Sequence, residues 1–441
     1  MELRDLKQSI ESRQAKIAVI GLGYVGLPVA AMFAESGFDV LGIDVKEERV
    51  AQINQGISPI EGDEPGLEDL IAGVVQQKRL KASSDYSLLA DRDIILIDVE
   101  TPVDENNIPR YEALKAALTS LAQVMKNGSL VIVESTIAPG TMRDVVKPLL
   151  EKNSAKQLNR DFYLGNCPER VMPGKLLTNL KNLSRVVGGA TPETSDVMAV
   201  LYACIVHAEL DPADWITAEL VKTTENAYRD VQIAFANEVA LISQALGGDA
   251  WKVRELVNKS PYRSMHLPGA GVGGHCIPKD PWLLAYGVHD LGVPLRLIPA
   301  ARAVNDSMPL HVFALLEDAL QEAGLTMNDV NVLVMGYAYL EDSDDIRNSP
   351  SKVLVEVLKQ AGAHVQIHDP FVPGYQTDLV ECLPAADAAV IMVAHSDYKN
   401  LDIAFLKENL RSGILVDGRR VFDPTIAKDV GLIFRSIGWG K

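Results

Sequence analysis

One stretch of the chain, PGAGVGGHCIPKDPW at residues 268–282, holds the residue types for covalent chemistry. Its cysteine, Cys276, follows four closely spaced glycines and precedes the charged pair Lys279 and Asp280. Glycine at that density serves unusual backbone angles or the close approach of another molecule. A thiol just before a helical turn is favoured as the thiolate, the nucleophilic form. The stretch predicts a nucleophilic cysteine, and the alternative is a tight turn around a buried, inert one.

A second motif, GLGYVG, lies between an apolar run at residues 16–21 and a helical pattern at residues 27–36. Its first glycine allows a tight turn, its second lets a diphosphate approach, and its third lets helix and strand pack closely. The next strand ends at an acid that should accept from ribose hydroxyls and repel a 2′-phosphate, which favours NAD over NADP. The alternative is a glycine turn without a ligand. The predicted cofactor residues of this motif are Gly21, Gly23, Tyr24, Val25, Gly26 and Asp44.

Polar residues follow three further strands. Two of these strands, at residues 94–99 and 130–134, run into small-residue turns that contain Thr101 and Thr136. Because ligands bind beyond the carboxyl ends of the strands in a doubly wound sheet, we expect both threonines near the nicotinamide ring and the reacting carbon. Turn capping is the alternative for each. After the third strand, Glu169 could handle a proton or a water and Arg170 could grip a polar substituent, or either could be an ordinary surface residue.

A long helix without internal glycine or proline is predicted at residues 218–246. Such a helix suits a hinge between domains and a dimer interface. Lys222, Asn226 and Arg229 are spaced i, i+4 and i+7, so they share one face, which we expect to point at a ligand. The alternative is a solvated face, with Glu225 beside the row.

A second α/β unit begins at residue 331 and lacks the GxGxxG turn, so it is not expected to hold a second dinucleotide. Its arginines Arg347, Arg419 and Arg420 lie near predicted strand ends, where they could hold the diphosphate of a nucleotide-linked substrate. Ordinary surface arginines are the alternative.

Composition narrows the class of protein. The 441 residues suit two or three domains, and the net charge of −17 argues against nucleic acid as the main partner. No apolar run is long enough to span a bilayer, and the charged N-terminus does not read as a signal peptide. The four cysteines are widely spaced, which argues against a metal site or disulfides and suits a reduced, cytoplasmic setting.

Six motifs in order resemble the NAD-dependent nucleotide-sugar 6-dehydrogenases, the family that includes UDP-glucose dehydrogenase. The resemblance runs from Lys16 to about Phe422. The motifs are GLGYVG (21–26), ESTIAPGT (134–141), CPERVMPG (167–174), AELVKTTEN (218–226), GVGGHCIPKDP (271–281) and DIRNSP (345–350).

The resemblance implies an α/β fold of two Rossmann-like doubly wound domains joined by a long central helix and a helical dimerisation region. It divides the chain into an NAD-binding domain (1–210), a central domain with the cysteine loop (211–315) and a UDP-sugar-binding domain (316–441). It also implies a homodimer through the central helix, with no nucleic acid, membrane or metal partner.

By the same resemblance, the C6 alcohol of a UDP-sugar is oxidised twice, with two NAD consumed per turnover. Cys276 would be the nucleophile, attacking the aldehyde and then carrying a thioester that water hydrolyses. Lys222 and Asn226 would steady the oxyanion, Asp280 and Thr136 would order the water, and Glu169 would act at the same centre. Lys279 joins the cofactor residues. The implied substrate-binding residues are Glu169, Arg170, Lys222, Asn226, Arg229, Arg263, Gly271, Gly273 and Arg419.

The PERV segment resembles members that act on UDP-N-acetylhexosamines. The resemblance thus implies UDP-N-acetyl-D-mannosamine as the substrate, with Arg170 at the acetamido carbonyl, and UDP-N-acetyl-D-glucosamine or UDP-glucose as alternatives. The uronate product would supply a surface polysaccharide. This chain departs from the family pattern at Glu100, at Leu340 and, by an approximate match only, at Arg263.

Two other classes of protein account for less of the sequence. A two-electron hydroxyacid or 6-phosphogluconate type of dehydrogenase needs neither Cys276 nor a second Rossmann-like half at residues 331–423. A non-catalytic NAD-binding regulatory protein would tolerate the loss of Lys222, Asn226, Cys276 and Asp280, all of which are present.

Overall fold

The computed structural model describes residues 2–60, 62 and 64–440, and the chain divides into two compact units. The first unit holds residues 1–225 and 282–293, and the second holds residues 226–281 and 294–441. The three domain ranges expected from the sequence stay a prediction.

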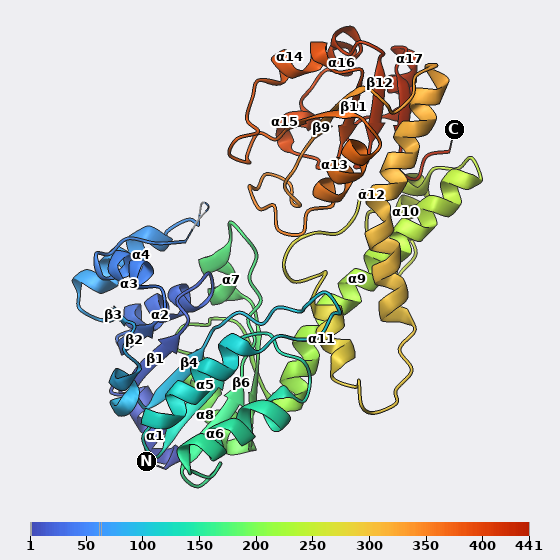
Figure 1. The fold of residues 1–441 in the computed structure, drawn as a ribbon. Coiled ribbons are helices and arrows are strands. Elements are labelled where there is room, and N and C mark those ends of the chain that lie inside the picture. Colours follow the sequence, from blue (N-terminus) through green and yellow to red (C-terminus); the bar gives the residue numbers. More distant parts are fainter. Residues whose placement is uncertain (1, 61, 63, 441) are drawn as a thin grey trace. The chain divides into compact units, whose positions relative to one another are not determined.

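The first unit contains an eight-stranded sheet in the order β3-β2-β1-β4-β5-β6-β7-β8 (Figure 1). Neighbouring strands are parallel except β6 and β7, which are antiparallel. β2 and β3 lie on one side of β1, and β4 and the later strands lie on the other. The strand order therefore reverses between β1 and β4, which is the switch point of a doubly wound fold. The strands are β1 (Lys16–Ile20), β2 (Asp39–Ile43), β3 (Leu80–Ser83), β4 (Ile94–Ile97), β5 (Ser129–Val133), β6 (Phe162–Asn166), β7 (Arg185–Gly189) and β8 (Leu210–Asp214).

Helices cover both faces of this sheet because its buried strands alternate their apolar side chains between two cores. Ile17 and Val19 face one core, with side chains of α1, α2, α4, α7 and α8. Ala18 and Ile20 face the other, with side chains of α5 and α6. The helices are α1 (Leu3–Glu11), α2 (Gly26–Glu35), α3 (Glu47–Asn54), α4 (Leu67–Gln76), α5 (Glu112–Val124), α6 (Lys147–Ser154), α7 (Leu176–Asn182) and α8 (Pro192–Tyr202).

The second unit contains a five-stranded parallel sheet in the order β10-β9-β11-β12-β13. Val332 and Val334 face a core shared with α12 and α13, whereas Leu333 and Met335 face a core shared with α14 to α17. The strands are β9 (Asn331–Met335), β10 (His364–His368), β11 (Ala388–Ile391), β12 (Ile414–Asp417) and β13 (Ile433–Ser436). The helices are α10 (Ala250–Val257), α12 (Leu297–Glu322), α13 (Pro350–Gln360), α14 (Leu379–Cys382), α15 (Ser396–Lys399), α16 (Ile403–Asn409) and α17 (Pro424–Asp429).

Two helices contribute residues to both units. The long helix α9 (Trp215–Ala245) begins in the first unit and ends in the second. The short helix α11 (Asp280–Tyr286) begins in the second unit and ends in the first. The predicted α/β class with two doubly wound sheets and one long helix is confirmed. Within the described part of the chain, no helix is long and apolar enough to cross a bilayer.

Candidate active site

The turn after β1 has the shape that a dinucleotide needs. Gly21 has a φ of +92°, which only glycine adopts readily, and its N–H donates to the Ile43 carbonyl at 2.7 Å. A Cβ on Gly21 would meet Asp98 O at 2.2 Å, and one on Gly26 would meet Gly21 O at 2.0 Å. A Cβ on Gly23, by contrast, would meet no described atom within 4 Å. That open space lies just before α2, where a helix N-terminus favours a diphosphate.

The predicted ribose acid, Asp44, lies directly after β2. Its side chain is buried, and its oxygens accept from Leu22 N–H and Lys46 N–H, each at 2.9 Å. The guanidinium of Arg49 lies 3.0 Å from the carboxylate and is partly exposed. The acid is thus fixed beside the glycine turn, with a polar partner that a ribose hydroxyl can replace.

Tyr24, inside the same turn, is tied to a distant loop. Its hydroxyl donates to the carboxylate of Glu64. Glu64 also accepts from Gly174 N–H at 2.8 Å and from Leu176 N–H at 3.1 Å. The carboxylate therefore joins the predicted cofactor turn to the segment that follows Glu169 and Arg170.

The two predicted threonines lie together at the carboxyl edge of the sheet. Thr101 Oγ1 donates to the Thr136 carbonyl at 2.6 Å. Ser135 Oγ donates to Val99 O at 2.6 Å and accepts from Val99 N–H at 3.0 Å, so several hydrogen bonds join the loops after β4 and β5. β4 pairs with β1 and β5 pairs with β4, all in parallel, which puts both loops at the same edge of the sheet as the glycine turn.

Glu169 and Arg170 follow β6, as expected. Arg170 is engaged in the described structure, with Nε 3.0 Å from Glu225 Oε2 and Nη1 2.9 Å from Ser184 Oγ. Glu169 is half-buried, and its Oε2 has no hydrogen-bond partner among the described residues. That oxygen of Glu169 is buried, and Arg170 would have to exchange a partner to reach a ligand.

The first half of α9 is anchored on the ESTIAPGT turn. Glu219 accepts from Gly140 N–H at 2.7 Å and from Met142 N–H at 2.8 Å, and burial raises its pKa to about 7. Lys222 is buried one turn further along. Asn226 follows it at i+4 on the same face, although the two residues belong to different units.

The second half of α9 is held by buried polar contacts with α12. Arg302 Nη1 lies 2.6 Å from Asp230 Oδ1, and Asn305 Nδ2 donates to the same oxygen at 2.7 Å. About two turns further on, Asn237 Oδ1 accepts from Gly269 N–H at 2.9 Å. The helix thus fixes the start of the cysteine loop.

The glycines before Cys276 lie against the chain itself. A Cβ on Gly273 would meet Tyr339 Cβ at 2.5 Å, and one on Gly274, whose φ is +88°, would meet the Tyr339 ring at 2.8 Å. A Cβ on Gly271 would meet Pro350 Cβ at 2.9 Å. The close approach predicted from these glycines is made by the segment 339–350, while their predicted contact with substrate stays a prediction.

Cys276 and Asp280 share one tight turn. The N–H groups of Lys279 and Asp280 donate to the Cys276 carbonyl at 3.1 and 2.8 Å, so the two side chains stand one helical turn apart. Asn226 Nδ2 donates to Asp280 Oδ2 at 2.6 Å, and Lys279 Nζ lies 3.5 Å from Asp280 Oδ1. Asp280 is buried and the Cys276 side chain is exposed. An accessible thiol and an oriented carboxylate therefore lie in the same turn.

The neighbouring His275 is neutral at physiological pH. Burial, assisted by the charges of Lys279 and Arg347, lowers its pKa to about 4. It can therefore accept or donate a hydrogen bond but adds no cation beside the thiol.

The predicted substrate arginines are placed unequally. Arg419 lies against the cysteine loop, with Nε donating to Met392 O at 2.8 Å and Nη2 to Gly271 O at 3.3 Å. Arg347 pairs with Asp345, Nε to Oδ1 at 2.9 Å, while its backbone carbonyl accepts from Gly274 N–H at 2.8 Å. Arg229 and Arg263 are exposed. Arg419 and Arg347 thus hold or flank the loop that carries Cys276, whereas Arg420 pairs with Asp249 at 2.9 Å.

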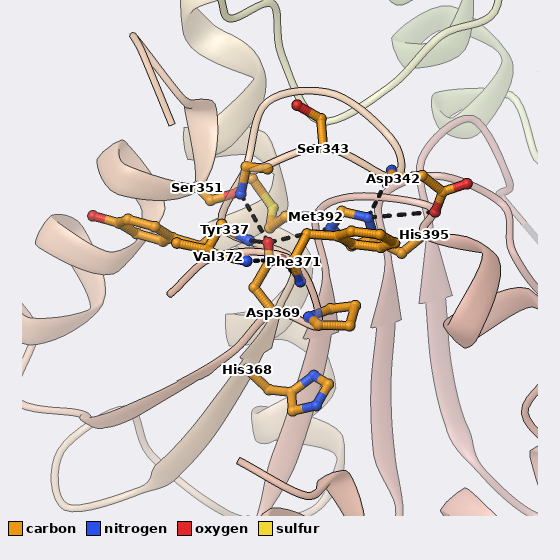
Figure 2. Close-up of polar contacts among 12 residues, drawn as sticks. Tyr337, Asp342, Ser343, Ser351, His368, Asp369, Phe371, Val372, Met392 and His395 are labelled. Carbon is orange, nitrogen blue, oxygen red and sulfur yellow. Dashed lines mark hydrogen bonds and ion pairs between the residues drawn. The ribbon is translucent and has the colours of Figure 1, made fainter. Parts of the chain in front are cut away.

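The turn after β9 is closed around a buried acid (Figure 2). Asp369 accepts from the N–H groups of Tyr337 and Ala338 at 2.6 and 2.9 Å, and of Phe371 and Val372 at 2.9 and 3.1 Å. His395 Nε2 lies 3.2 Å from the same carboxylate, and its Nδ1 accepts from Asp342 N–H at 2.9 Å. This acid fixes the segment that packs on the cysteine loop.

Sequence reasoning did not single out Glu64, Tyr339, Asp369 or His395 as residues of the site. One signal was present for Asp369, since it ends the second strand of its unit as Asp44 does. The others act on residues far away in the sequence, and no local pattern marks them.

Comparison with known proteins covers the whole chain. Residues 15–206 match the NAD binding domain of the UDP-glucose/GDP-mannose dehydrogenase family, residues 216–307 its central domain and residues 333–424 its UDP binding domain.

Individual relatives agree with those matches. The chain is 38% identical to a UDP-N-acetyl-D-mannosamine dehydrogenase of Pyrococcus horikoshii over 96% of this chain and 99% of that one, and superposes on its structure with a TM-score of 0.90. An NDP-N-acetyl-D-galactosaminuronic acid dehydrogenase from Methanosarcina mazei is 35% identical, over 100% and 98% of the two chains, with a TM-score of 0.89. A UDP-glucose dehydrogenase from Pyrobaculum islandicum is 28% identical, over 96% and 98%, with a TM-score of 0.84.

Proposed function

The chain belongs to the UDP-glucose/GDP-mannose dehydrogenase family and is an NAD-dependent UDP-sugar dehydrogenase, and we propose that its substrate is UDP-N-acetyl-D-mannosamine. The first six curated relatives, 32–38% identical, are named for that sugar. The PERV segment supports an N-acetylated sugar. A UDP-glucose dehydrogenase is similar at the lower identity of 28%, which favours the N-acetylhexosamine.

The main support for this proposal is the turn that holds Cys276 and Asp280. An exposed thiol stands one helical turn from a buried carboxylate, and Asn226 orients that carboxylate through a 2.6 Å hydrogen bond. A four-electron oxidation gains from a covalent tether, because the aldehyde is then not lost between the two oxidations. A thiol beside a base is the arrangement that such a tether requires.

The proposed reaction has two oxidations and one hydrolysis. NAD⁺, held at the glycine turn and Asp44, would supply the hydride acceptor for each of the two oxidations of C6. Cys276 Sγ adds to the aldehyde carbon between the oxidations, and Lys222 and Asn226 stabilise the oxyanion. The second oxidation leaves a thioester on Cys276. Water, activated by Asp280 with Thr136 and Glu169, cleaves it to the carboxylate and the thiol.

The other assignments concern binding, and Thr136 and Glu169 take part in both binding and reaction. We assign the NAD site to the GLGYVG turn, Asp44, Thr101, Thr136 and Lys279. The open space at Gly23 and the acid after β2 support that assignment. Substrate contacts are assigned to Glu169, Arg170, Arg229, Arg263, Gly271, Gly273 and Arg419.

The same proposal includes a homodimer through α9. Its exposed apolar side chains Tyr228, Phe235 and Ile242 recur every seven residues, with fractional exposures of 62%, 59% and 54%. A stripe with that period suits a second copy of the helix. Phe235→Glu should convert the dimer to a monomer in light scattering, and an unchanged mass would remove α9 from the interface. We further propose a cytoplasmic enzyme whose uronate product enters a surface polysaccharide.

Substrate profiling tests the reaction and the sugar together. NADH formed per sugar consumed is measured with UDP-N-acetylmannosamine, UDP-N-acetylglucosamine, UDP-N-acetylgalactosamine and UDP-glucose. We expect about two NADH per UDP-N-acetylmannosamine, as the thioester route requires. A ratio of one would exclude the covalent route. Two NADH from another sugar would keep the mechanism and replace the substrate.

The nucleophile has its own test. Cys276→Ala should abolish acid formation, whereas Cys204→Ala, at a partly buried cysteine, should leave it unchanged. Normal acid formation by the Cys276 variant would end the thioester mechanism.

A further inference from the structure

Two carboxyl groups outside the proposed reaction, the buried Glu134 and the half-buried Asp98, stand side by side in the first unit. Asp98 follows β4 and Glu134 follows β5, and the last residues of these strands, Ile97 and Val133, are paired in register. Each side chain has one buried oxygen, Asp98 Oδ2 and Glu134 Oε2, without a hydrogen-bond partner among the described residues.

The second oxygen of Glu134 is already occupied. Glu134 Oε1 accepts from Tyr202 Oη at 2.6 Å and from Arg185 Nη1 at 3.2 Å, and the Glu134 and Arg185 side chains are almost fully buried. Leaving two buried carboxylate oxygens without donors is costly. A single proton on Asp98, donated to Glu134 Oε2, would satisfy both oxygens at once.

The charges around the pair agree with one bound proton. The groups that face it are Glu169, Arg185, Cys167 and Tyr202. Burial raises the pKa of the Cys167 thiol to about 12 and raises that of Tyr202, so neither adds charge. Burial and the charge of Glu134 raise the pKa of Asp98 well above its usual range, against the opposing effect of Arg185.

Asp98 also lies directly beneath the dinucleotide turn. A Cβ on Gly26, at the start of α2, would stand 2.9 Å from Asp98 Cβ, and one on Gly21 would stand 2.2 Å from Asp98 O. A diphosphate bound at this turn brings negative charge toward the same place. An ionised Asp98 would oppose it, and a neutral one would not.

We infer that Asp98 and Glu134 share one proton and that Asp98 is a positioning residue of the dinucleotide turn, so that loss of this proton at alkaline pH weakens NAD binding. The inference rests on the NAD-binding part of the proposed function and on nothing about the sugar. Its first readout needs no ligand, so its failure and that of the proposed function are distinguishable.

Infrared spectroscopy of the ligand-free protein reads the proton directly. One component of the protonated-carboxyl C=O stretch at neutral pH, beside that of Glu219 with its pKa of about 7, should vanish in Asp98→Asn and persist in Asp93→Asn. Asp93 is the matched control, since it flanks the other end of β4 and is bound to Lys126 at 2.5 Å and to Lys16 N–H at 2.7 Å. Absence of the band in the wild-type protein, or its survival in Asp98→Asn, would overturn the shared proton.

NAD titration calorimetry at neutral and alkaline pH tests the consequence. Wild-type affinity should fall about three- to tenfold as Asp98 ionises, whereas Asp98→Asn should show a flat profile. The pH at which affinity falls should match the pH at which the wild-type infrared band vanishes, a comparison that holds even if the variant folds poorly. An equal fall in both proteins, or a fall at a different pH, would overturn the coupling to NAD.

Unfolding temperature separates this role from an ordinary ion pair. The acid binds more protons in the folded than in the unfolded chain above about pH 4, so wild-type stability is lost as the pH rises. Asp98→Asn should therefore melt above wild type at neutral pH, with a gap that narrows toward pH 4. Glu134→Gln should melt below it, because Arg185 loses its carboxylate. The reverse order would identify Asp98 as the ionised partner.

Discussion

The turns after β1 and after β9 begin alike. Gly21 and Gly336 have φ values of +92° and +93°, and the N–H of each donates to the last carbonyl of the neighbouring strand. Each neighbouring strand ends in an acid that accepts from the turn, Asp44 from Leu22 N–H and Asp369 from Tyr337 N–H. The two sheets thus start from the same local arrangement.

They differ in what the turn leads to. After β1 the helix starts at Gly26, and the space at Gly23 stays open. After β9 the helix starts only at Pro350, and the intervening loop is closed by Asp369, His395 and four backbone N–H groups. The same turn therefore makes a ligand site where the helix begins at once, and a support for the cysteine loop where it begins late.

The sharpest test exchanges one glycine in each turn. In Gly336→Ala, the new Cβ would lie 2.6 Å from Val393 Cβ at a positive φ, so we expect a loss of about 3–5 kcal/mol in unfolding free energy. In Gly23→Ala, stability should change by less than about 1 kcal/mol while the NAD dissociation constant rises about a hundredfold.

Denaturant unfolding and NAD titration of both variants check this contrast. A stable Gly336→Ala would show that the turn after β9 has room to open. Unchanged NAD affinity in Gly23→Ala would show that the open space at Gly23 does not hold the diphosphate of NAD.

The two acids should separate in the same way. Asp369→Asn removes a buried charge that accepts from four N–H groups, and should cost about 2–4 kcal/mol of stability with NAD affinity unchanged. Asp44→Asn should cost about 1 kcal/mol of stability and weaken NAD about tenfold. Melting curves and NAD titrations of both variants test this difference. A loss of NAD binding in Asp369→Asn would contradict a purely structural role for Asp369.

Low pH should reduce the unfolding free energy of the second unit by protonating Asp369. Burial raises its pKa, but hydrogen bonds from His395 and from backbone N–H groups outweigh burial and lower the pKa to about 2. The unfolded chain has a pKa of about 3.9, so the contribution is present above pH 4 and is lost as the pH falls toward 2. The expected loss is about 2.5 kcal/mol. Unfolding curves between pH 5 and pH 2 should show this slope in wild type and not in Asp369→Asn.

The smallest effect is expected on the surface of the same loop. Lys399 Nζ lies 2.6 Å from Glu341 Oε2, and both side chains are about half exposed. Lys399→Ala should cost less than about 0.5 kcal/mol, because exposed ion pairs contribute little. A loss of unfolding free energy as large as that in Asp369→Asn would show that the surface ion pair stabilises the loop as much as its buried acid does.

Much of this fold was predictable from periodicity and turn residues. Buried strands at residues 16–21 and 38–43, the glycine turn and Asp44 follow directly from the pattern, and the long helix differs from its prediction only by a few terminal residues. β3, β7, β8 and β13 were not predicted. β3 (LKAS) and β13 (IFRS) are only four residues long. β7 runs antiparallel to β6 through two residue pairs, and β8 is the polar segment LDPAD, so neither has the apolar run that marks a buried strand.

The site was less predictable where distant segments meet. The glycines at 271–274 were attributed to a ligand, but a sequence cannot show that Tyr339 and Pro350 fill that space. Arg170 was assigned to the sugar, and its pairing with Glu225 depends on a contact 55 residues away in the chain. The acid pair at Asp98 and Glu134 looks ordinary in the sequence, because the burial that gives it a proton comes from the fold.

The unequal burial of the cysteines bears on oxidative damage. Cys167 and Cys382 are buried, Cys204 is intermediate, and Cys276 is exposed. A peroxide or an alkylating reagent therefore meets Cys276 first, and oxidation beyond the sulfenic acid would inactivate the enzyme irreversibly. A single reporter group attached at limiting reagent would consequently mark the proposed nucleophile.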